Sequence, residues 1–356
     1  MNNFEIKTRI KFGEGSLKAL QELKNKNVLI ITDPFMVKSK TIDKITSNLI
    51  NSTYQVFEEI VPDPPIEVVV AGIEAFKSIN PDVIIALGGG SAIDAAKSIM
   101  DFSKKILKIN EVEFIAIPTT SGTGSEVTSF AVITDSQKKC KYPLVSDDLL
   151  PDMAILDPEL VKTVPNFITA DTGMDVLTHA IEAYVSTNSN DFSDALAEKA
   201  IKLVFKYLIK AYKDGNDIEA REQMCYACFL NGIAFSNAGL GNVHAMAHQL
   251  GGLYDLPHGV CNAMLLPIVE EENAKSAPAK FRPIAEVIGM DVNNKSDKEC
   301  VDFVIDKIKA LSEEVGIPKS LKDVGVDNPN FELLAENSMK DACAGANPVF
   351  FDKDKI

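Results

Sequence analysis

The chain has 356 residues, 46% hydrophobic and 24% charged, a composition typical of a globular protein with one or two domains. Its 36 basic and 51 acidic side chains give a formal net charge of −15, which argues against a nucleic acid or an anionic membrane as partner. The sequence shows no apolar run near the ~20 residues of a membrane span, no secretory signal and no compact disulfide framework, so we expect a cytoplasmic protein.

Short apolar runs alternate with amphipathic stretches over residues 1–160. Residues 27–33, 82–88 and 113–119 are predicted to be buried strands, and residues 66–79 show the apolar spacing of a helix. Strands that alternate with helices indicate a parallel sheet with helical crossover connections.

Two glycine-rich segments follow directly after two of these strands. The first is GGGS at residues 88–91, which leads into a helical pattern, and the second is PTTSGTGSE at residues 118–126. Glycines let backbone N–H groups approach a phosphate, and a helix N-terminus adds a favourable partial charge. Because ligands of open α/β sheets bind at the carboxyl ends of the strands, these loops predict a dinucleotide or another phosphate ligand.

Asp33 stands at the end of the first predicted strand. A carboxylate there can accept a hydrogen bond from a ribose 2′-hydroxyl and would repel a 2′-phosphate, which favours NAD over NADP. An aspartate before a proline is also a common turn former, and the sequence leaves both interpretations open.

The pattern changes after residue 160 to that of amphipathic helices, without a convincing strand. We therefore predict two domains, residues 1–160 with a parallel sheet and residues 161–356 with helices only. Four stretches show the apolar spacing of a helix: residues 168–186, 194–212, 220–236 and 301–315.

All four histidines lie in one stretch of the second half, and Asp175 precedes the first of them by one helical turn. Asp175 and His179 are spaced i, i+4, as are His244 and His248, so each pair shares a helix face. His258 follows shortly after. A carboxylate and several imidazoles are a ligand set for Fe²⁺ or Zn²⁺. The alternative is that each histidine is an isolated core or surface residue. That alternative fits poorly with an aspartate and four histidines at these spacings.

These motifs resemble those of the iron-containing (group III) alcohol dehydrogenases. The similar segments include GGGSAID, PTTSGTGSEVT, LPDMAILDPEL and GMDVLTHAIEAYVS, from about residue 4 to about residue 270. Within the family, VPDPPIEVV and DFSDALAEKAIKLVFKYL look most similar to the propanol dehydrogenases of propanediol utilisation. The resemblance implies a dehydroquinate-synthase-like fold, with an N-terminal α/β domain of Rossmann-like type, an all-helical C-terminal domain and an active site in the cleft between them.

Matching to the family implies specific roles. His248 matches a histidine near the nicotinamide, which we expect to relay a proton or to support the metal site. Phe130, Val132 and Phe235 would line the substrate pocket. The implied metal ligands are Asp175, His179, His244 and His258. The implied contacts with NAD(H) are Asp33, Gly89, Gly90, Ser91, Asp94, Thr119, Thr120, Thr123, Ser125 and Lys141.

The C-terminal segment CAGANPVFFDKDKI matches the family's Asn-Pro at Asn347 and Pro348, but we find no match to the family's usual terminal helix. We expect weaker packing or weaker oligomer contacts at this end of the chain.

The implied function is that of an NAD-dependent, iron-dependent alcohol dehydrogenase or short-chain aldehyde reductase, converting propanal to 1-propanol or a similar pair. Fe²⁺ is the expected metal, with Zn²⁺ as the metal of an isolated preparation. The alternatives are a metal-dependent polyol dehydrogenase for glycerol, 1,3-propanediol or lactaldehyde/1,2-propanediol, a non-redox metal hydrolase, and an idle structural homologue. We expect a small alcohol or aldehyde as substrate, a homo-oligomer such as a dimer, and an association with bacterial microcompartment enzymes.

Overall fold

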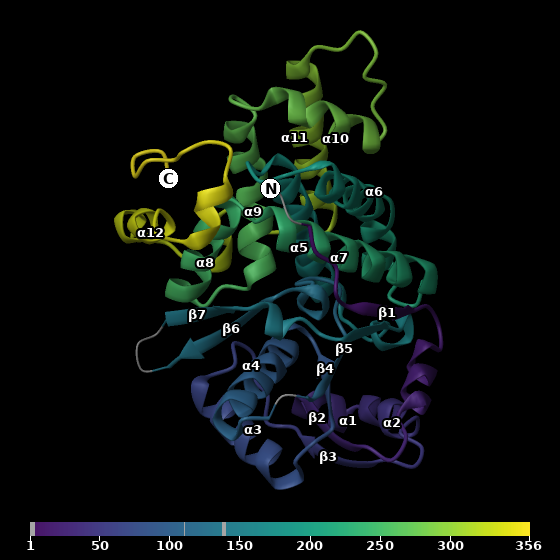
Figure 1. Ribbon diagram of the computed structural model, residues 1–356. Helices are drawn as coiled ribbons and strands as arrows, with labels where there is room; N and C mark the ends of the chain where they lie inside the picture. The colour runs from purple at the N-terminus through teal and green to yellow at the C-terminus, as the bar shows by residue number, and fades with distance from the viewer. Residues whose placement is uncertain (1–3, 110, 137–139) are drawn as a thin grey trace. The chain divides into compact units, whose positions relative to one another are not determined.

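The computed structural model describes residues 4–109, 111–136 and 140–356. The chain divides into two compact units (Figure 1): the sheet unit, Ile6–Thr163, and the helical unit, Val164–Ile356 together with Phe4 and Glu5. Within the described part of the chain, no helix has the length and apolar character needed to cross a membrane.

The sheet unit is built on six parallel strands, which confirms the predicted parallel sheet. The strands follow the order β1-β8-β5-β4-β2-β3. The three predicted strands are confirmed as β2, β4 and β5. Their bounds are β1 (Arg9–Phe12), β2 (Asn27–Thr32), β3 (Thr53–Phe57), β4 (Val83–Gly88), β5 (Glu113–Pro118) and β8 (Met153–Leu156).

Helices cover both faces of the sheet, because its strands are apolar on both sides. Figure 1 shows α3 and α4 on one side of the sheet and α1 and α2 on the other. Alternate residues of a strand point to opposite faces: Leu29 and Ile31 of β2 pack with residues of α3 and α4, whereas Val28 and Ile30 pack with residues of η1 and α2. The helical segments of this unit are η1 (Ser16–Glu22), α1 (Pro34–Lys38), α2 (Thr41–Thr46), α3 (Ile66–Ile79), α4 (Gly90–Leu107), η2 (Ser125–Val127), η3 (Asp147–Leu149) and η4 (Pro158–Leu160).

The strand order reverses between β2 and β4. From β2 the chain passes to β3 at one edge, whereas from β4 it crosses through α4 to β5 on the other side. The carboxyl ends of β2 and β4 therefore flank a topological switch point, where open α/β sheets bind ligands. A separate antiparallel hairpin, β6 (Phe130–Asp135) and β7 (Cys140–Val145), follows β5.

The helical unit is centred on α5, which packs against α6, α7 and α9. Because it is surrounded, α5 is buried without interruption from Gly173 to Val185. The four predicted helices are confirmed within α5, α6, α7 and α11. The elements are α5 (Asn166–Val185), α6 (Asp191–Lys213), α7 (Ile218–Ala238), α8 (Asn242–Tyr254), α9 (His258–Asn273), η5 (Pro278–Lys280), α10 (Phe281–Val287), α11 (Asp297–Glu314), η6 (Leu321–Val324), α12 (Phe331–Ser338) and η7 (Ala342–Ala346).

Local sequence signals fix where these helices begin. Asn190 accepts hydrogen bonds from the backbone N–H groups of Phe192 and Ser193, and the Ser193 hydroxyl completes a capping box at α6. Ser296 and Glu299 form the same motif at α11. Each cap satisfies backbone N–H groups that have no partner inside the helix.

Glu270 of α9 is a carboxyl group with 0% exposure inside the helical unit. Its Oε1 accepts a hydrogen bond from Asn273, whereas Oε2 has no partner among the described residues. Burial raises the pKa of Glu270 to about 8, because the charged form is poorly solvated.

Glu270→Gln is expected to change how stability depends on pH. The folded state binds more protons than the unfolded state between the ordinary pKa of a glutamate and pH 8, so the free energy of unfolding falls as pH rises through this interval. The variant should be more stable than the parent at pH 8, by ~1–3 kcal/mol, and the difference should vanish near pH 5. Urea unfolding followed by circular dichroism measures it. Glu271→Gln, at an exposed neighbour, is the control, and equal pH profiles for all three proteins would contradict the assignment.

Candidate active site

The predicted metal ligands gather in one cluster of the helical unit. Asp175 and His179 come from α5, His244 from α8, and His258 is the first residue of α9. One ligand atom from each lies within 4.8 Å of every other. From Asp175 Oδ1 the distances are 3.9 Å to His179 Nδ1, 3.8 Å to His244 Nε2 and 3.6 Å to His258 Nε2.

A glycine lets α9 begin close enough to α5 to deliver His258. A Cβ on Gly259 would collide with the backbone carbonyl of Asp171, one helical turn before Asp175. A larger residue there would push the start of α9 away from α5. The glycine that directly follows His258 thus permits the close approach of α9 to α5, and this approach positions His258.

Glu182 holds the start of α8. Its Oε1 accepts the backbone N–H of Val243 at 2.7 Å, and its Oε2 lies 2.5 Å from His244 Nδ1. Gly241 permits this approach, since a Cβ there would lie 2.9 Å from Glu182 Oε1 and 2.6 Å from Asn347 Oδ1. With one proton held between Nδ1 and the carboxylate, the Nε2 lone pair of His244 faces the cluster.

The surroundings favour the neutral form of His179 and His244. Burial lowers the pKa of His179, and burial together with the neighbouring histidines holds the pKa of His244 well below its ordinary value. Burial raises the pKa of Glu182 well above its usual range, against the pull of backbone N–H groups at the start of α8. Burial and the charge of Asp175 raise the pKa of Asp171 to about 6. A neutral imidazole is the form that binds a metal.

The cluster fits a divalent metal on two grounds. First, its donor set is three imidazole nitrogens and one carboxylate oxygen, which suits Fe²⁺ and Zn²⁺. Second, His179 Nδ1 is buried without a hydrogen-bond partner among the described residues, and a buried polar atom left unpaired is costly. The Asp175, His179 and His244 side chains are 4%, 6% and 1% exposed, whereas His258 is 37% exposed.

Asn262 sits among the ligands, one helical turn after His258. Its Nδ2 lies 2.7 Å from Asp175 Oδ1, 3.0 Å from His244 Nε2 and 3.1 Å from His258 Nε2. The amide has two N–H donors, which are shared among three of the four ligand atoms and keep them near one another. The i, i+4 spacing from His258 is a sequence signal that could have singled out Asn262, as the spacing from His179 could have singled out Glu182.

His248 lies one turn beyond His244 on α8, and its ring stacks on that of His258 with centroids 5.4 Å apart. Its Nδ1 bonds Asp341 Oδ2 at 2.9 Å. Asp341 is negatively charged. The hydrogen bonds from His248 and from the backbone N–H of Cys343 hold the pKa of Asp341 below its ordinary value despite burial. No periodicity links residues 93 positions apart, so Asp341 carries no signal that sequence patterns could reveal.

The glycine-rich loop after β4 packs closely against the loop that follows β5. Gly88 has a φ of +151°, and a Cβ on Gly90 would lie 2.7 Å from the Thr123 side chain. Gly89 is the N-cap of α4 and adds no capping side chain. The N–H groups of Gly90 and Ser91 at the start of this helix are therefore available to an anion.

Two residues of α4 anchor the loop that follows β5. Asp94 accepts hydrogen bonds from the Ser125 hydroxyl at 2.5 Å and the Val132 N–H at 2.9 Å. The buried Lys97 donates to the carbonyls of Thr128 and Phe130, both at 2.7 Å. Burial lowers the pKa of Lys97 to about 8. Asp94 and Ser125 are thus hydrogen-bonded to each other. Their contact with the cofactor remains a prediction.

The remaining predicted residues lie in several places. Asp33 caps α1 through Oδ1, while its Oδ2 lies beside Gly88. Thr119 and Thr120 follow β5 directly. Lys141 Nζ pairs with Asp63 Oδ1 at 2.6 Å.

The three residues predicted to line the substrate pocket are divided between the units. Phe130 and Val132 belong to β6 of the sheet unit. Phe235 of α7 stacks on the His179 ring in the helical unit, with centroids 4.5 Å apart.

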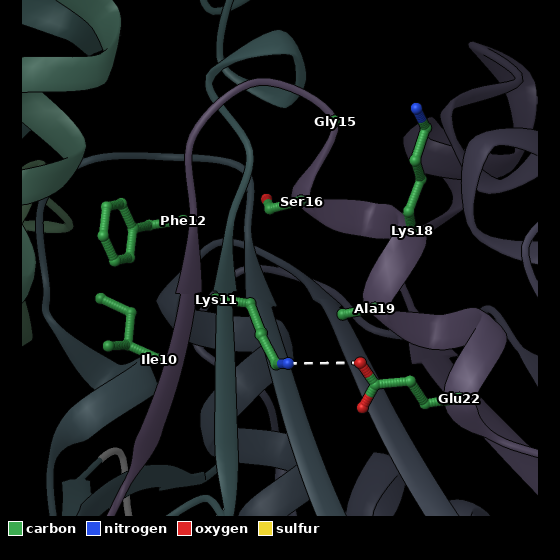
Figure 2. Close-up of a pocket in the computed structure, with 8 residues that line it drawn as sticks. All are labelled: Ile10, Lys11, Phe12, Gly15, Ser16, Lys18, Ala19 and Glu22. Atoms are coloured by element: carbon green, nitrogen blue, oxygen red, sulfur yellow. Dashed lines mark hydrogen bonds and ion pairs between the residues drawn. The ribbon is translucent and has the colours of Figure 1, made fainter.

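A surface pocket of about 430 Å³ lies elsewhere in the sheet unit, between β1 and η1 (Figure 2). The Lys11 Nζ and Glu22 Oε1 atoms point toward one another across it, 3.3 Å apart. Its lining residues differ from the predicted site residues, so we assign it no part in the chemistry.

Comparison with known proteins identifies the family. The family described as "Iron-containing alcohol dehydrogenase" matches residues 7–158, and the C-terminal part of the "Fe-containing alcohol dehydrogenase family" matches residues 169–356. The chain belongs to the iron-containing alcohol dehydrogenases. It is an oxidoreductase that acts on alcohols, as the resemblance of its motifs predicted.

Relatives and solved structures agree with this assignment. The 1-propanol dehydrogenase PduQ of Salmonella typhimurium is 46% identical over 98% of this chain and 96% of its own length. The NADPH-dependent butanol dehydrogenase of Clostridium saccharobutylicum is 41% identical over 100% and 96%. A crystal structure of a 1,3-propanediol oxidoreductase has a TM-score of 0.93 at 37% identity and covers 99% of this chain and 97% of that one.

Glu182→Gln is expected to weaken metal binding. The substitution keeps the shape of the side chain but replaces the carboxylate that orients His244, and loss of such a partner typically costs about 10- to 100-fold in metal affinity. Competition with a chelator, read as bound metal per chain, measures the loss independently of activity. Glu198→Gln, which alters a carboxylate bonded to Tyr184, is the matched control. Unchanged affinity in Glu182→Gln would refute the orienting role.

Proposed function

We propose that the protein is an NAD-dependent, iron-dependent alcohol dehydrogenase that acts mainly as a short-chain aldehyde reductase, with propanal to 1-propanol as the leading reaction. The observation that carries the proposal is the convergence of Asp175, His179, His244 and His258 on one point. The family membership supplies the reaction class.

In this proposal the four clustered side chains hold Fe²⁺, or Zn²⁺ in an isolated preparation. A divalent metal there supplies Lewis acidity, which polarises an aldehyde carbonyl or lowers the pKa of an alcohol. The residues around the cluster do the positioning: Glu182 fixes the tautomer of His244, and Asn262 holds three ligand atoms near one another. Phe235 packs flat on His179 and limits the rotation of that ring.

His248 is the proposed proton relay. Its Nδ1–H donates to the Asp341 carboxylate, so Nε2 is the atom that can take a proton from an alcohol or give one to the product oxygen. The side chain is 36% exposed, which allows exchange with solvent. The competing role, support of the ligand geometry, fits the stacking of its ring on His258.

The sheet unit is the proposed site for NAD(H). The N–H groups at the start of α4 would bind the pyrophosphate, and Gly89, Gly90, Ser91 and Thr123 shape that site. Asp33, at the carboxyl end of β2, would accept hydrogen bonds from the adenosine ribose through Oδ2. The cofactor would supply the hydride. Asp94, Thr119, Thr120, Ser125 and Lys141 complete the proposed contacts.

A polyol reaction is the second candidate, since the solved structure of a 1,3-propanediol oxidoreductase covers nearly the whole chain. Comparing propanal with 3-hydroxypropanal as substrates separates the two, because a polyol enzyme would show the higher kcat/KM for the hydroxylated aldehyde. We further propose a cytoplasmic homo-oligomer such as a dimer, associated with bacterial microcompartment enzymes. Support for the last point is the similarity to the PduQ protein.

Removal and replacement of the metal should switch the activity off and on. Protein stripped of metal is expected to oxidise NADH with propanal no faster than buffer, and anaerobic Fe²⁺ should restore the rate. His258→Ala should reduce that rate at least ~100-fold, because one of the four ligands is lost. The measurement is NADH absorbance, with Ile268→Ala, an exposed residue of the same helix, as control. A full rate in the stripped protein would contradict the proposal.

Asp33→Ser should relax the preference for NADH over NADPH. A serine can still cap α1, but it no longer repels a 2′-phosphate, so kcat/KM with NADPH should rise about tenfold or more relative to NADH. Asp43→Ser, at an exposed aspartate of α2, should leave the ratio unchanged. A ratio that does not respond to Asp33→Ser would restrict Asp33 to its capping role.

A further inference from the structure

A second cluster of metal-binding side chains lies beside the proposed ligands but shares none of them. His248 of α8 meets Asp341 and Cys343, which come from the start of η7. One ligand atom from each lies within 4.8 Å of the other two. All three side chains are partly buried. Imidazole nitrogen, carboxylate oxygen and cysteine sulfur are the three ligand types that Zn²⁺ binds in proteins.

We propose that His248, Asp341 and Cys343 form a second metal site, selective for a thiolate-binding divalent cation such as Zn²⁺. The first cluster has only nitrogen and oxygen donors, whereas the second includes a sulfur. Softer ligands favour Zn²⁺ over Fe²⁺. Three protein ligands leave a fourth tetrahedral position for water or another small ligand.

The cluster needs little rearrangement to bind an ion. His248 Nδ1 and Asp341 Oδ2 are 2.9 Å apart, and two ligands of a tetrahedral zinc ion, at bond lengths of about 2.0 to 2.1 Å, are roughly 3.3 Å apart. The carboxylate is already oriented, because the Cys343 N–H donates to Oδ1 at 3.0 Å and Gln249 Nε2 donates to Oδ2 at 3.3 Å. Asp341 caps η7, and this cap places Cys343 next to the Asp341 carboxylate.

Binding requires two proton movements. The proton on His248 Nδ1 is lost and Nε2 takes one up, so the imidazole changes tautomer and stays neutral. The Cys343 thiol releases its proton to solvent, and the sulfur electron pair forms the bond to the ion. Burial and the charge of Asp341 raise the pKa of the Cys343 thiol well above its ordinary value, so without a cation the thiol stays protonated, and a cation would offset the charge repulsion.

An ion at this site would fix His248 and occupy Nδ1, with Nε2 protonated. His248 could then give its Nε2 proton to the product oxygen only by becoming an imidazolate, so aldehyde reduction should be inhibited by zinc added beyond the amount that fills the first cluster. This consequence rests on the proposed role of His248, whereas occupancy of the second site does not.

The test uses Co²⁺ as probe on the full-length protein stripped of metal. A thiolate bound to Co²⁺ gives a charge-transfer band in the near ultraviolet, and the first cluster has no sulfur ligand, so the band reports the second site alone. We expect two Co²⁺ ions per chain and the band in the parent protein. Cys343→Ser should bind one ion and lack the band. Cys300→Ser, which removes a buried thiol of α11, should behave like the parent.

Binding of a single Co²⁺ by the parent without the band would overturn the proposal, as would persistence of the band in Cys343→Ser. Should Cys343→Ser not fold, Asp341→Asn provides the same test, since loss of the carboxylate should weaken the band-forming ion by at least about tenfold. Excess Zn²⁺ should inhibit the iron-loaded parent more strongly than Cys343→Ser. A band without such inhibition would support the site and contradict the relay role of His248.

Discussion

The hydrogen bond between Glu182 and His244 is the interaction on which the geometry of the helical unit's site depends. Glu182 belongs to α5, the helix that also carries Asp175 and His179, and it reaches the first turn of α8. One carboxylate therefore sets the distance between two ligand-bearing helices and the tautomer of one ligand. Because both groups are buried, loss of either would leave the other unpaired at high cost.

The C-terminal segment reinforces the same junction. Asn347 accepts the backbone N–H of Asn242 at the start of α8 and donates to the side-chain oxygen of Asn273 and the backbone carbonyl of Val349. Asp341 of this segment holds His248. Residues that are distant in sequence from the histidines thus determine how α8 presents two of them. The geometry of the site therefore depends both on the helices that carry the ligands and on a segment with little regular structure.

In the sheet unit, the proposed cofactor site is formed mainly by backbone groups. The site proposed for NAD(H) lies at the ends of three neighbouring parallel strands, two of which lead into glycine-rich turns. Asp94 and Lys97 of α4 are engaged with the loop after β5 rather than left open to a ligand. These bonds hold that loop against the helix whose N-terminus would carry the phosphate.

Periodicity and turn chemistry predicted much of this structure. The strands β2, β4 and β5 were evident as short apolar runs because both their faces are buried, and the long helices were evident from their spacing. The strand β3 was missed, since TYQVF carries polar side chains and is largely exposed, and the sequence did not indicate that β8 completes the parallel sheet.

The candidate site was predictable to the extent that it is local. The pairs Asp175 and His179, and His244 and His248, follow from helical spacing. The positioning groups Glu182 and Asn262 carry the same kind of signal but resemble ordinary polar residues of a helix. Asp341 could not be found from the sequence, because its contact with His248 arises only from tertiary folding.

The most direct test of the central claim is anomalous diffraction at the iron absorption edge from crystals grown anaerobically with Fe²⁺. The account predicts a peak bounded by Asp175, His179, His244 and His258, with the Asn262 amide no longer bonded to the His244 and His258 nitrogens. Iron bound elsewhere, or an empty cluster whose side chains keep their bonds to Asn262 despite saturating Fe²⁺, would contradict it.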